Sequence, residues 1–135
     1  MGGGSVLDGT KFIAAAIPYE GEDPWQIVLD RKNYKTALPL GSVLTLPATG
    51  SEMNYYAVIS RTETKEKKGM GGPLLYPQFS ILDPETTYTL PTQQVANGIA
   101  DAFTHVMEQY MTYPADAPMQ LITASSTEKA ASPTI

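Results

Sequence analysis

The spacing of apolar residues near the start of the chain predicts two helices. From Ser5 to Pro18 the apolar side chains recur with helical spacing, and Ser5 can accept a hydrogen bond from the free amides of the first turn. Pro18 is expected to end this helix. A second, shorter helix is predicted directly afterwards, because Asp23 is a favourable N-cap and Pro24 suits the first helical position.

Three segments have the composition of strands. They are rich in β-branched, aromatic and other apolar side chains, and turn-forming residues bound them. The predicted strands cover residues 42–46, 55–60 and 78–82. The stretch between the second and the third, residues 62–72, is polar and rich in glycine, so we predict a mobile loop there.

The longest helical pattern spans residues 92–112, and Thr92 can cap it. One apolar stripe runs along this helix, formed by Ile99, Phe103, Val106 and Tyr110. Residues 120–135 are rich in Ser, Thr and Ala without an amphipathic period, so we expect them to be disordered. Strands interleaved with helices, followed by one long helix of different character, predict an α/β fold.

Composition and charge narrow the classes of function. The chain has 135 residues, a formal net charge of −5 and no cysteine. Disulfides and thiolate metal sites are therefore excluded, and duplex nucleic acid is not an expected partner because no basic stripe is present. No apolar run approaches the ~20 residues that span a bilayer, and no signal sequence is apparent. We therefore expect a cytoplasmic protein that does not bind membranes.

One pair of residues on the long helix has metal-binding chemistry. Asp101 and His105 are four positions apart, so they lie on one face of the helix. A carboxylate oxygen and an imidazole nitrogen at this spacing can grip a divalent metal such as iron or zinc. A solvated helix face on which the two side chains form a weak pair explains the same pattern, and two ligands alone do not make a site.

Two further segments could bind phosphate groups. Gly2, Gly3, Gly4 and Ser5 stand at the start of the first helix, where glycines let a pyrophosphate approach free amides. An artificial linker has the same composition. The segment TLPATGSE follows a predicted strand, which is where ligands bind in open α/β sheets, although an ordinary turn is the simpler interpretation. Lys67 could neutralise a phosphate or lie free in solvent.

Five blocks of sequence occur in an order that resembles a known family. They are GGGSVLDGTKF, VLTLPATGSE, VISR, LDPETTYTLP and ANGIADAFTHVMEQY. Together they resemble the middle of the iron-containing (group III) alcohol dehydrogenases, and most closely the branch of NADPH-dependent aldehyde reductases and butanol dehydrogenases. The resemblance covers roughly residues 2–119. It favours the phosphate-binding interpretation of the glycines, because the family carries that loop.

The resemblance implies a fold, two cofactors and a set of site residues. Residues 1–91 would form part of a Rossmann-like dinucleotide-binding α/β layer, and residues 92–119 the first helix of a metal-binding helical domain. The four residues from Gly2 to Ser5 would bind the pyrophosphate of NADP, with Asp8 near the cofactor and Lys67 beside the nicotinamide. The wall around the adenosine and phosphate would be formed by Thr45, Leu46, Thr49 and Ser51. Asp101 and His105 would be two of four ligands to iron or zinc.

The chain also departs from the family pattern. His105 is its only histidine, so the other two histidine ligands of the family have no counterpart. The resemblance thus implies an internal part of an NADP-dependent oxidoreductase with weak or absent metal binding and little activity of its own. Two alternatives are a nucleotide- or phosphate-binding module without catalysis and a self-associating structural remnant. We expect a homo-oligomer, since sheet edge and the apolar helix face would be exposed.

Overall fold

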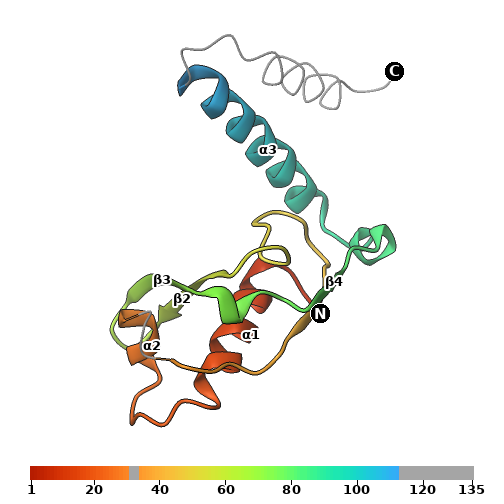
Figure 1. Cartoon of the computed structure of the whole chain (residues 1–135). Helices are drawn as coiled ribbons and strands as arrows, with labels where there is room; N and C mark the ends of the chain where they lie inside the picture. Colours follow the sequence, from red (N-terminus) through yellow and green to blue (C-terminus); the bar gives the residue numbers. More distant parts are fainter. Residues whose placement is uncertain (31–33, 113–135) are drawn as a thin grey trace, which may run out of the picture. The chain divides into compact units, whose positions relative to one another are not determined.

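The computed structural model describes residues 1–30 and 34–112 (Figure 1). The elements in chain order are α1 (Gly4–Ala16), α2 (Trp25–Leu29), β1 (Gly41–Val43), β2 (Tyr56–Arg61), β3 (Glu66–Gly71), the 3₁₀ turn η1 (Pro73–Leu75), β4 (Phe79–Ile81), the 3₁₀ turn η2 (Pro84–Thr87) and α3 (Thr92–Thr112). The chain forms two units, which divide between Thr89 and Leu90. The predicted disordered tail, residues 120–135, lies outside the described residues.

The first unit contains a short parallel sheet. β1 pairs with β4, with Ser42 opposite Ser80, and the two hydroxyls are hydrogen-bonded at 2.8 Å. Gly2 extends this sheet on its other side through an isolated parallel bridge to Leu44. The predicted strand at 42–46 is therefore present but shorter, and it begins one residue earlier. Three parallel segments thus end at one edge, as in a Rossmann-like layer.

The second sheet corrects the prediction of a mobile loop at residues 62–72. β2 and β3 form an antiparallel hairpin in which Ala57 lies opposite Met70. Met70 is fully buried, although the three residues before it in the strand, 67–69, are exposed. One buried methionine and the pairing to β2 hold the segment extended, and neither is visible in local composition. The predicted strand at 55–60 is present, but it pairs with β3 and does not join the parallel sheet.

The hydrophobic core lies between the hairpin and the first two helices. α1 packs along β2, and α2 packs on β3 (Figure 1). The core cluster consists of Ala15, Trp25, Ile27, Val28, Tyr34, Ala57, Met70 and Leu75. Because the cluster is small, each large side chain in it contributes a sizeable part of the stability.

The helix starts differ from their predictions in small ways. α1 begins at Gly4 with Gly3 as its N-cap, and no side chain caps it, so the predicted role of Ser5 as the cap is wrong. Asp23 lies one position before the N-cap of the second helix, and its Oδ1 still accepts a hydrogen bond from the Trp25 amide at 2.9 Å. That helix starts at Trp25, one residue later than predicted, with Pro24 in the flanking position.

Asp23 also joins α2 to the hairpin. Its Oδ2 lies 2.9 Å from Arg61 Nη1, and the Arg61 guanidinium lies over the Trp25 ring, 5.8 Å from its centroid. The Trp25 amide and then Arg61 lower the pKa of the Asp23 carboxyl below its ordinary value. The charged form is therefore favoured in the folded state.

The pH dependence of stability should report this pairing. A lowered carboxyl pKa contributes stability that is present above the ordinary value of 3.8 and is lost as the pH falls through the folded-state value. Asp23→Asn keeps an acceptor for the Trp25 amide but removes the charge. We expect the variant to lose less stability than the parent between about pH 5 and pH 3 in urea unfolding. Equal acid slopes for the two proteins would show that Asp23 contributes nothing to acid unfolding.

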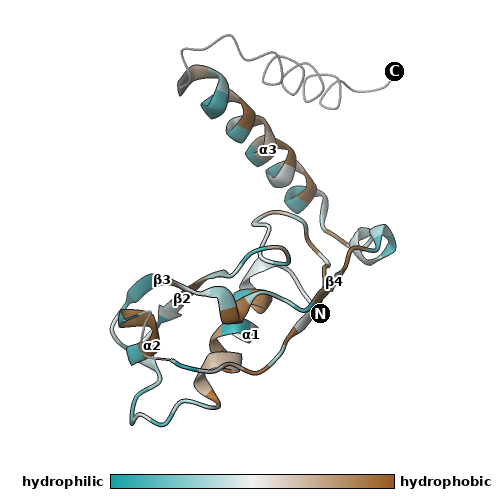
Figure 2. Ribbon diagram, viewed as in Figure 1, coloured by the Kyte–Doolittle hydropathy of each residue, from teal (hydrophilic) through white to brown (hydrophobic). Residues whose placement is uncertain are grey.

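The second unit contains α3, along which hydrophobic and hydrophilic residues lie on different sides of the ribbon (Figure 2). Its apolar stripe is about half exposed, at 50% for Ile99 and 46% for Phe103. The described part of the chain contains no helix that is long and apolar enough to cross a membrane. Self-association through this stripe stays a prediction.

Candidate functional site

The glycine turn, residues 2–4, leads from the parallel sheet into α1. The Gly2 amide donates to Val43 O at 3.0 Å, and the Thr45 amide donates to Gly2 O at 3.2 Å. Gly3 O accepts from the Leu7 amide, which closes the first turn of the helix. Within the described residues, the amides of Gly3, Gly4 and Ser5 have no protein acceptor. The turn therefore offers free N–H groups at the positive end of a helix.

The loop after β1 packs against this turn. A Cβ atom on Gly4 would lie 2.6 Å from Thr49 Oγ1, and one on Gly3 would lie 3.2 Å from Leu46 Cβ. The two glycines thus let the loop approach the backbone of the turn closely. Gly50 carries the loop through a left-handed conformation at φ +65°. The structure therefore brings two sequence-predicted segments together at the carboxyl edge of the parallel sheet.

The segment after β4 adjoins the same edge. The Thr86 hydroxyl donates to Leu44 O and to Asp83 O, which fixes η2 beside the end of β1. The Asp83 carboxylate caps η2 by accepting from the Glu85 amide at 3.0 Å. This edge, outside the carboxyl ends of parallel strands, is where open α/β sheets bind their ligands.

A buried polar cluster lies one to two turns further along α1, and its central residue was not singled out from the sequence. Lys11 is fully buried, and its Nζ donates to Ser51 O at 2.7 Å and to Ser51 Oγ at 2.8 Å. Asp8 Oδ1 accepts from Ser51 Oγ at 2.7 Å. Burial lowers the pKa of the Lys11 ammonium, and the negative charges of Asp8 and Glu52 act in the opposite direction.

The same cluster covers the edge of β2 that β3 leaves unpaired. Lys11 Nζ donates to Tyr56 O at 2.8 Å, and Asp8 Oδ2 accepts from the Val58 amide at 2.8 Å. Side chains of α1 thus replace a neighbouring strand at these two backbone groups. Asp8 and Ser51, both predicted to lie near a cofactor, therefore have structural partners as well. In the sequence, Lys11 has the character of an ordinary polar residue of a helix. Only its burial in the structure shows that it belongs to this cluster.

Lys67 lies elsewhere in the first unit. It is an exposed residue of β3, opposite Ser60 in the hairpin. The predicted loop around it is a strand, so its side chain starts from a fixed backbone position. No interaction in the described residues joins Lys67 to the glycine turn, and its role beside a nicotinamide stays a prediction.

The predicted metal ligands are neighbours on α3. Asp101 Oδ2 lies 3.7 Å from His105 Nε2, and both side chains are more than half exposed. Their donor types suit iron or zinc, and both atoms can face one ion. The described residues contain no cluster of three or more His, Cys, Asp or Glu side chains that could hold a metal. The pair therefore fits a metal in kind but supplies too few ligands by itself.

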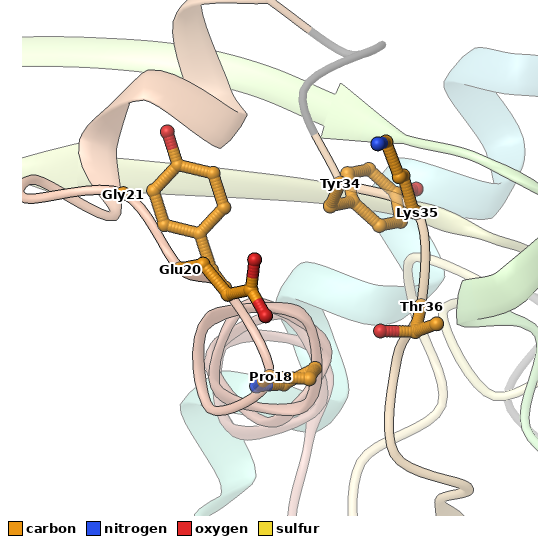
Figure 3. A pocket seen from close by; sticks show the side chains of 7 residues that line it. Pro18, Glu20, Gly21, Tyr34, Lys35 and Thr36 are labelled. Carbon is orange, nitrogen blue, oxygen red and sulfur yellow. The ribbon is translucent and has the colours of Figure 1, made fainter.

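Two hollows of the first unit lie away from the glycine turn. One, of about 370 Å³, has Pro18, Glu20 and Gly21 on one wall and Tyr34 and Lys35 on the other (Figure 3). The other, of about 310 Å³, is lined by Phe12, Asp23, Pro24, Trp25, Ile59, Ser60 and Arg61. Neither includes a residue of the predicted site.

Comparison with known proteins identifies the family of this chain. The model of the iron-containing alcohol dehydrogenases matches residues 1–84. The parallel sheet and the glycine turn lie within the matched residues, and the Asp101–His105 pair of α3 follows them in the same chain. The chain therefore belongs to the iron-containing alcohol dehydrogenase family.

Individual relatives agree with that assignment. The chain is 58% identical over 122 residues to the NADPH-dependent aldehyde reductase YqhD of Escherichia coli, which covers 89% of this chain and 32% of the relative. It is 52% identical over 120 residues to the probable NADH-dependent butanol dehydrogenase 1 of Bacillus subtilis, with 89% of this chain and 31% of that protein covered.

Solved structures show the same likeness. A crystal structure of Escherichia coli YqhD matches 95% of this chain with a TM-score of 0.77 and 55% identity, and 33% of that structure is covered. The NADH-dependent butanol dehydrogenase A of Thermotoga maritima matches 95% of this chain with a TM-score of 0.76 and 40% identity, over 34% of its own length. The chain thus spans about a third of the relatives it matches. The predicted α/β, Rossmann-like class and the family resemblance are confirmed.

Proposed function

We propose that this chain forms the pyrophosphate-binding part of an NADP-dependent alcohol or aldehyde oxidoreductase. The observation that carries the proposal is the glycine turn, with three free amides at the start of α1 and the loop after β1 packed against it. Free amides at a helix start bind phosphate groups, and the carboxyl edge of a parallel sheet supplies the place. The nicotinamide dinucleotides named for the relatives carry such a pyrophosphate.

Most of the predicted residues then have a task in binding. The backbone of Gly2, Gly3 and Gly4 admits the pyrophosphate, and the exposed Thr49 hydroxyl lies where it can donate to a phosphate oxygen. Ser51 and Asp8 hold the loop against α1 and β2. Lys67 would contribute positive charge from β3. We assign all of these residues to binding and orientation.

A complete reaction needs groups beyond this site. When bound, the nicotinamide would supply a hydride and a divalent metal would polarise the carbonyl oxygen. Asp101 and His105 would hold that metal together with ligands from outside the described residues. Their exposure on α3 leaves both side chains free to turn toward a shared ion.

A second candidate function is dinucleotide or phosphate binding without catalysis. The incomplete ligand set on α3 favours it, because binding at the glycine turn needs no metal. The two candidates share the same binding site. They differ in whether aldehyde-dependent oxidation of NADPH accompanies binding.

A substitution at Gly3 tests the binding site. Gly3 is the N-cap of α1 with φ −88°, a conformation open to any residue. Aspartate there would cap the helix, because its carboxylate would accept hydrogen bonds from the free amides. The same negative charge would repel a pyrophosphate. We expect Gly3→Asp to raise the Kd for NADPH roughly tenfold or more, equivalent to about 1.4 kcal/mol, in a fluorescence titration. Helix stability should rise by a few tenths of a kcal/mol, offset in part by contact with Leu46.

Gly3→Ser is the matched control, since serine caps the helix without a charge. Its Kd should lie between those of the parent and Gly3→Asp. Equal affinity of all three proteins for NADPH would place the dinucleotide elsewhere. No saturable change with the parent chain up to millimolar NADPH would remove both candidate functions.

A further inference from the structure

Lys11 is an unusual residue for the place it occupies. Its side chain is fully buried in the first unit, where an ammonium group loses most of its hydration. Lysine is almost never fully buried unless it is paired. The surroundings of Lys11 Nζ therefore indicate what the buried charge does.

Among residues 1–30 and 34–112, every hydrogen bond of the Lys11 ammonium goes to one short segment. The acceptors are Ser51 O and Ser51 Oγ, Asn54 Oδ1 at 3.3 Å and Tyr56 O. All belong to residues 51–56, which connect the loop after β1 to β2. The charge is thus used to anchor this segment on α1.

Two of those residues also hold Thr49. Asn54 Nδ2 donates to Thr49 O at 3.4 Å, and the Ser51 amide donates to Thr49 Oγ1 at 3.4 Å. Thr49 in turn lies so close to Gly4 that no Cβ fits between them. A continuous path of contacts therefore runs from Lys11 through Ser51 and Asn54 to Thr49 and the glycine turn.

We propose that Lys11 is a positioning residue of the dinucleotide site: its ammonium anchors residues 49–56 on α1 and so fixes Thr49 against the glycine turn. The proposal rests on the proposed function, since it assigns Thr49 to a bound pyrophosphate. Lys11 itself is buried, so we assign it an indirect role through Thr49. Asp8 supports it by holding Ser51 Oγ and by supplying a negative charge nearby.

Lys11→Met tests the proposal, because it keeps the length and apolar stem of the side chain but removes the ammonium. In the 135-residue chain without ligand, hydrogen exchange at the Ser51, Tyr56 and Val58 amides should become about tenfold faster or more. The amides that pair β2 with β3 should change little. The Kd for NADPH should rise by a similar factor, and Lys11→Gln should show a smaller change in both measurements.

Two controls separate positioning from general loss of stability. Leu75→Ala removes a fully buried core side chain away from the site, and it should lower the unfolding midpoint without weakening NADPH binding while the protein is folded. Lys35→Met removes an exposed lysine and should change neither measurement.

The outcomes are distinct. Unchanged exchange at the three amides in both Lys11 variants would overturn this proposal and leave the proposed function intact. Equal weakening of NADPH binding by Leu75→Ala and Lys11→Met would show that Lys11 is merely structural. A parent chain that does not bind NADPH would overturn the proposed function, and with it the role of Lys11 in binding.

Discussion

Replacing Ile27 with alanine is expected to lower the free energy of unfolding by about 2–5 kcal/mol. Ile27 is fully buried in α2 and belongs to the cluster between the two helices and the hairpin. Truncation removes apolar burial and leaves a cavity that a well-packed core cannot fill. Small domains have only about 5–15 kcal/mol of stability, so this loss is a large fraction of the total. Urea unfolding followed by circular dichroism measures it.

Ile13→Ala is the matched control for that experiment. Ile13 also lies in a helix, but it is 56% exposed. Alanine is the better helix former, and this gain nearly cancels the loss of apolar contacts at Ile13. The free energy of unfolding should therefore change by no more than about 0.5 kcal/mol. Similar losses for the two variants would mean that the core does not lie where the structure places it.

The second large effect concerns metal binding by the 135-residue chain. After loading with iron or zinc and dialysis, the chain is expected to retain far less than a stoichiometric amount of metal. Asp101 and His105 supply two ligands on an exposed helix face, whereas a stable site needs roughly three or four protein ligands. Elemental analysis of the dialysed protein measures the retained metal.

Aldehyde-dependent oxidation of NADPH by this chain is expected to stay at background for the same reason. Hydride transfer also requires cofactor and substrate to be held in a productive geometry. His105→Ala is the control, and it should behave as the parent does. A full equivalent of metal in the parent, together with turnover that His105→Ala abolishes, would falsify this prediction.

Periodic and turn-forming residues predicted most of the elements. The helical spacing after Ser5, the Asp23-Pro24 pair and the long pattern of residues 92–112 each correspond to a helix of the structure. These signals are local, since a helix needs only a cap and an apolar face within a few residues. The N-cap of α1 is Gly3 and not the predicted Ser5, because backbone conformation decides where a helix begins as much as side-chain type does.

Pairing between strands could not be predicted in the same way. The strand β3 has the composition of a loop, and it is extended only because Met70 enters the core opposite Ala57. Propensity in strands depends on the neighbours that a residue meets across the sheet, which local sequence does not contain.

In the candidate site, too, local sequence predicted some residues and not others. The glycines and Thr49 follow from their place beside helix and strand ends, and the structure brings them together. Lys11 was missed because its partners, Ser51, Asn54 and Tyr56, lie some forty positions away in the chain. A lysine in a helix gives no local sign that it will be buried.

The parallel sheet has a consequence for the order of folding. The hairpin closes through residues 62–65, so its two strands meet at little cost in chain entropy. Gly41 and Phe79, by contrast, come together only after the whole hairpin has been looped out between them, and the Gly2 bridge depends on the sheet they form. Non-local pairing of this kind is slow, because the chain loses the entropy of loop closure before the stabilising contacts form. The glycine turn should therefore acquire its shape late in folding, after the β2–β3 hairpin, α1 and α2 have formed.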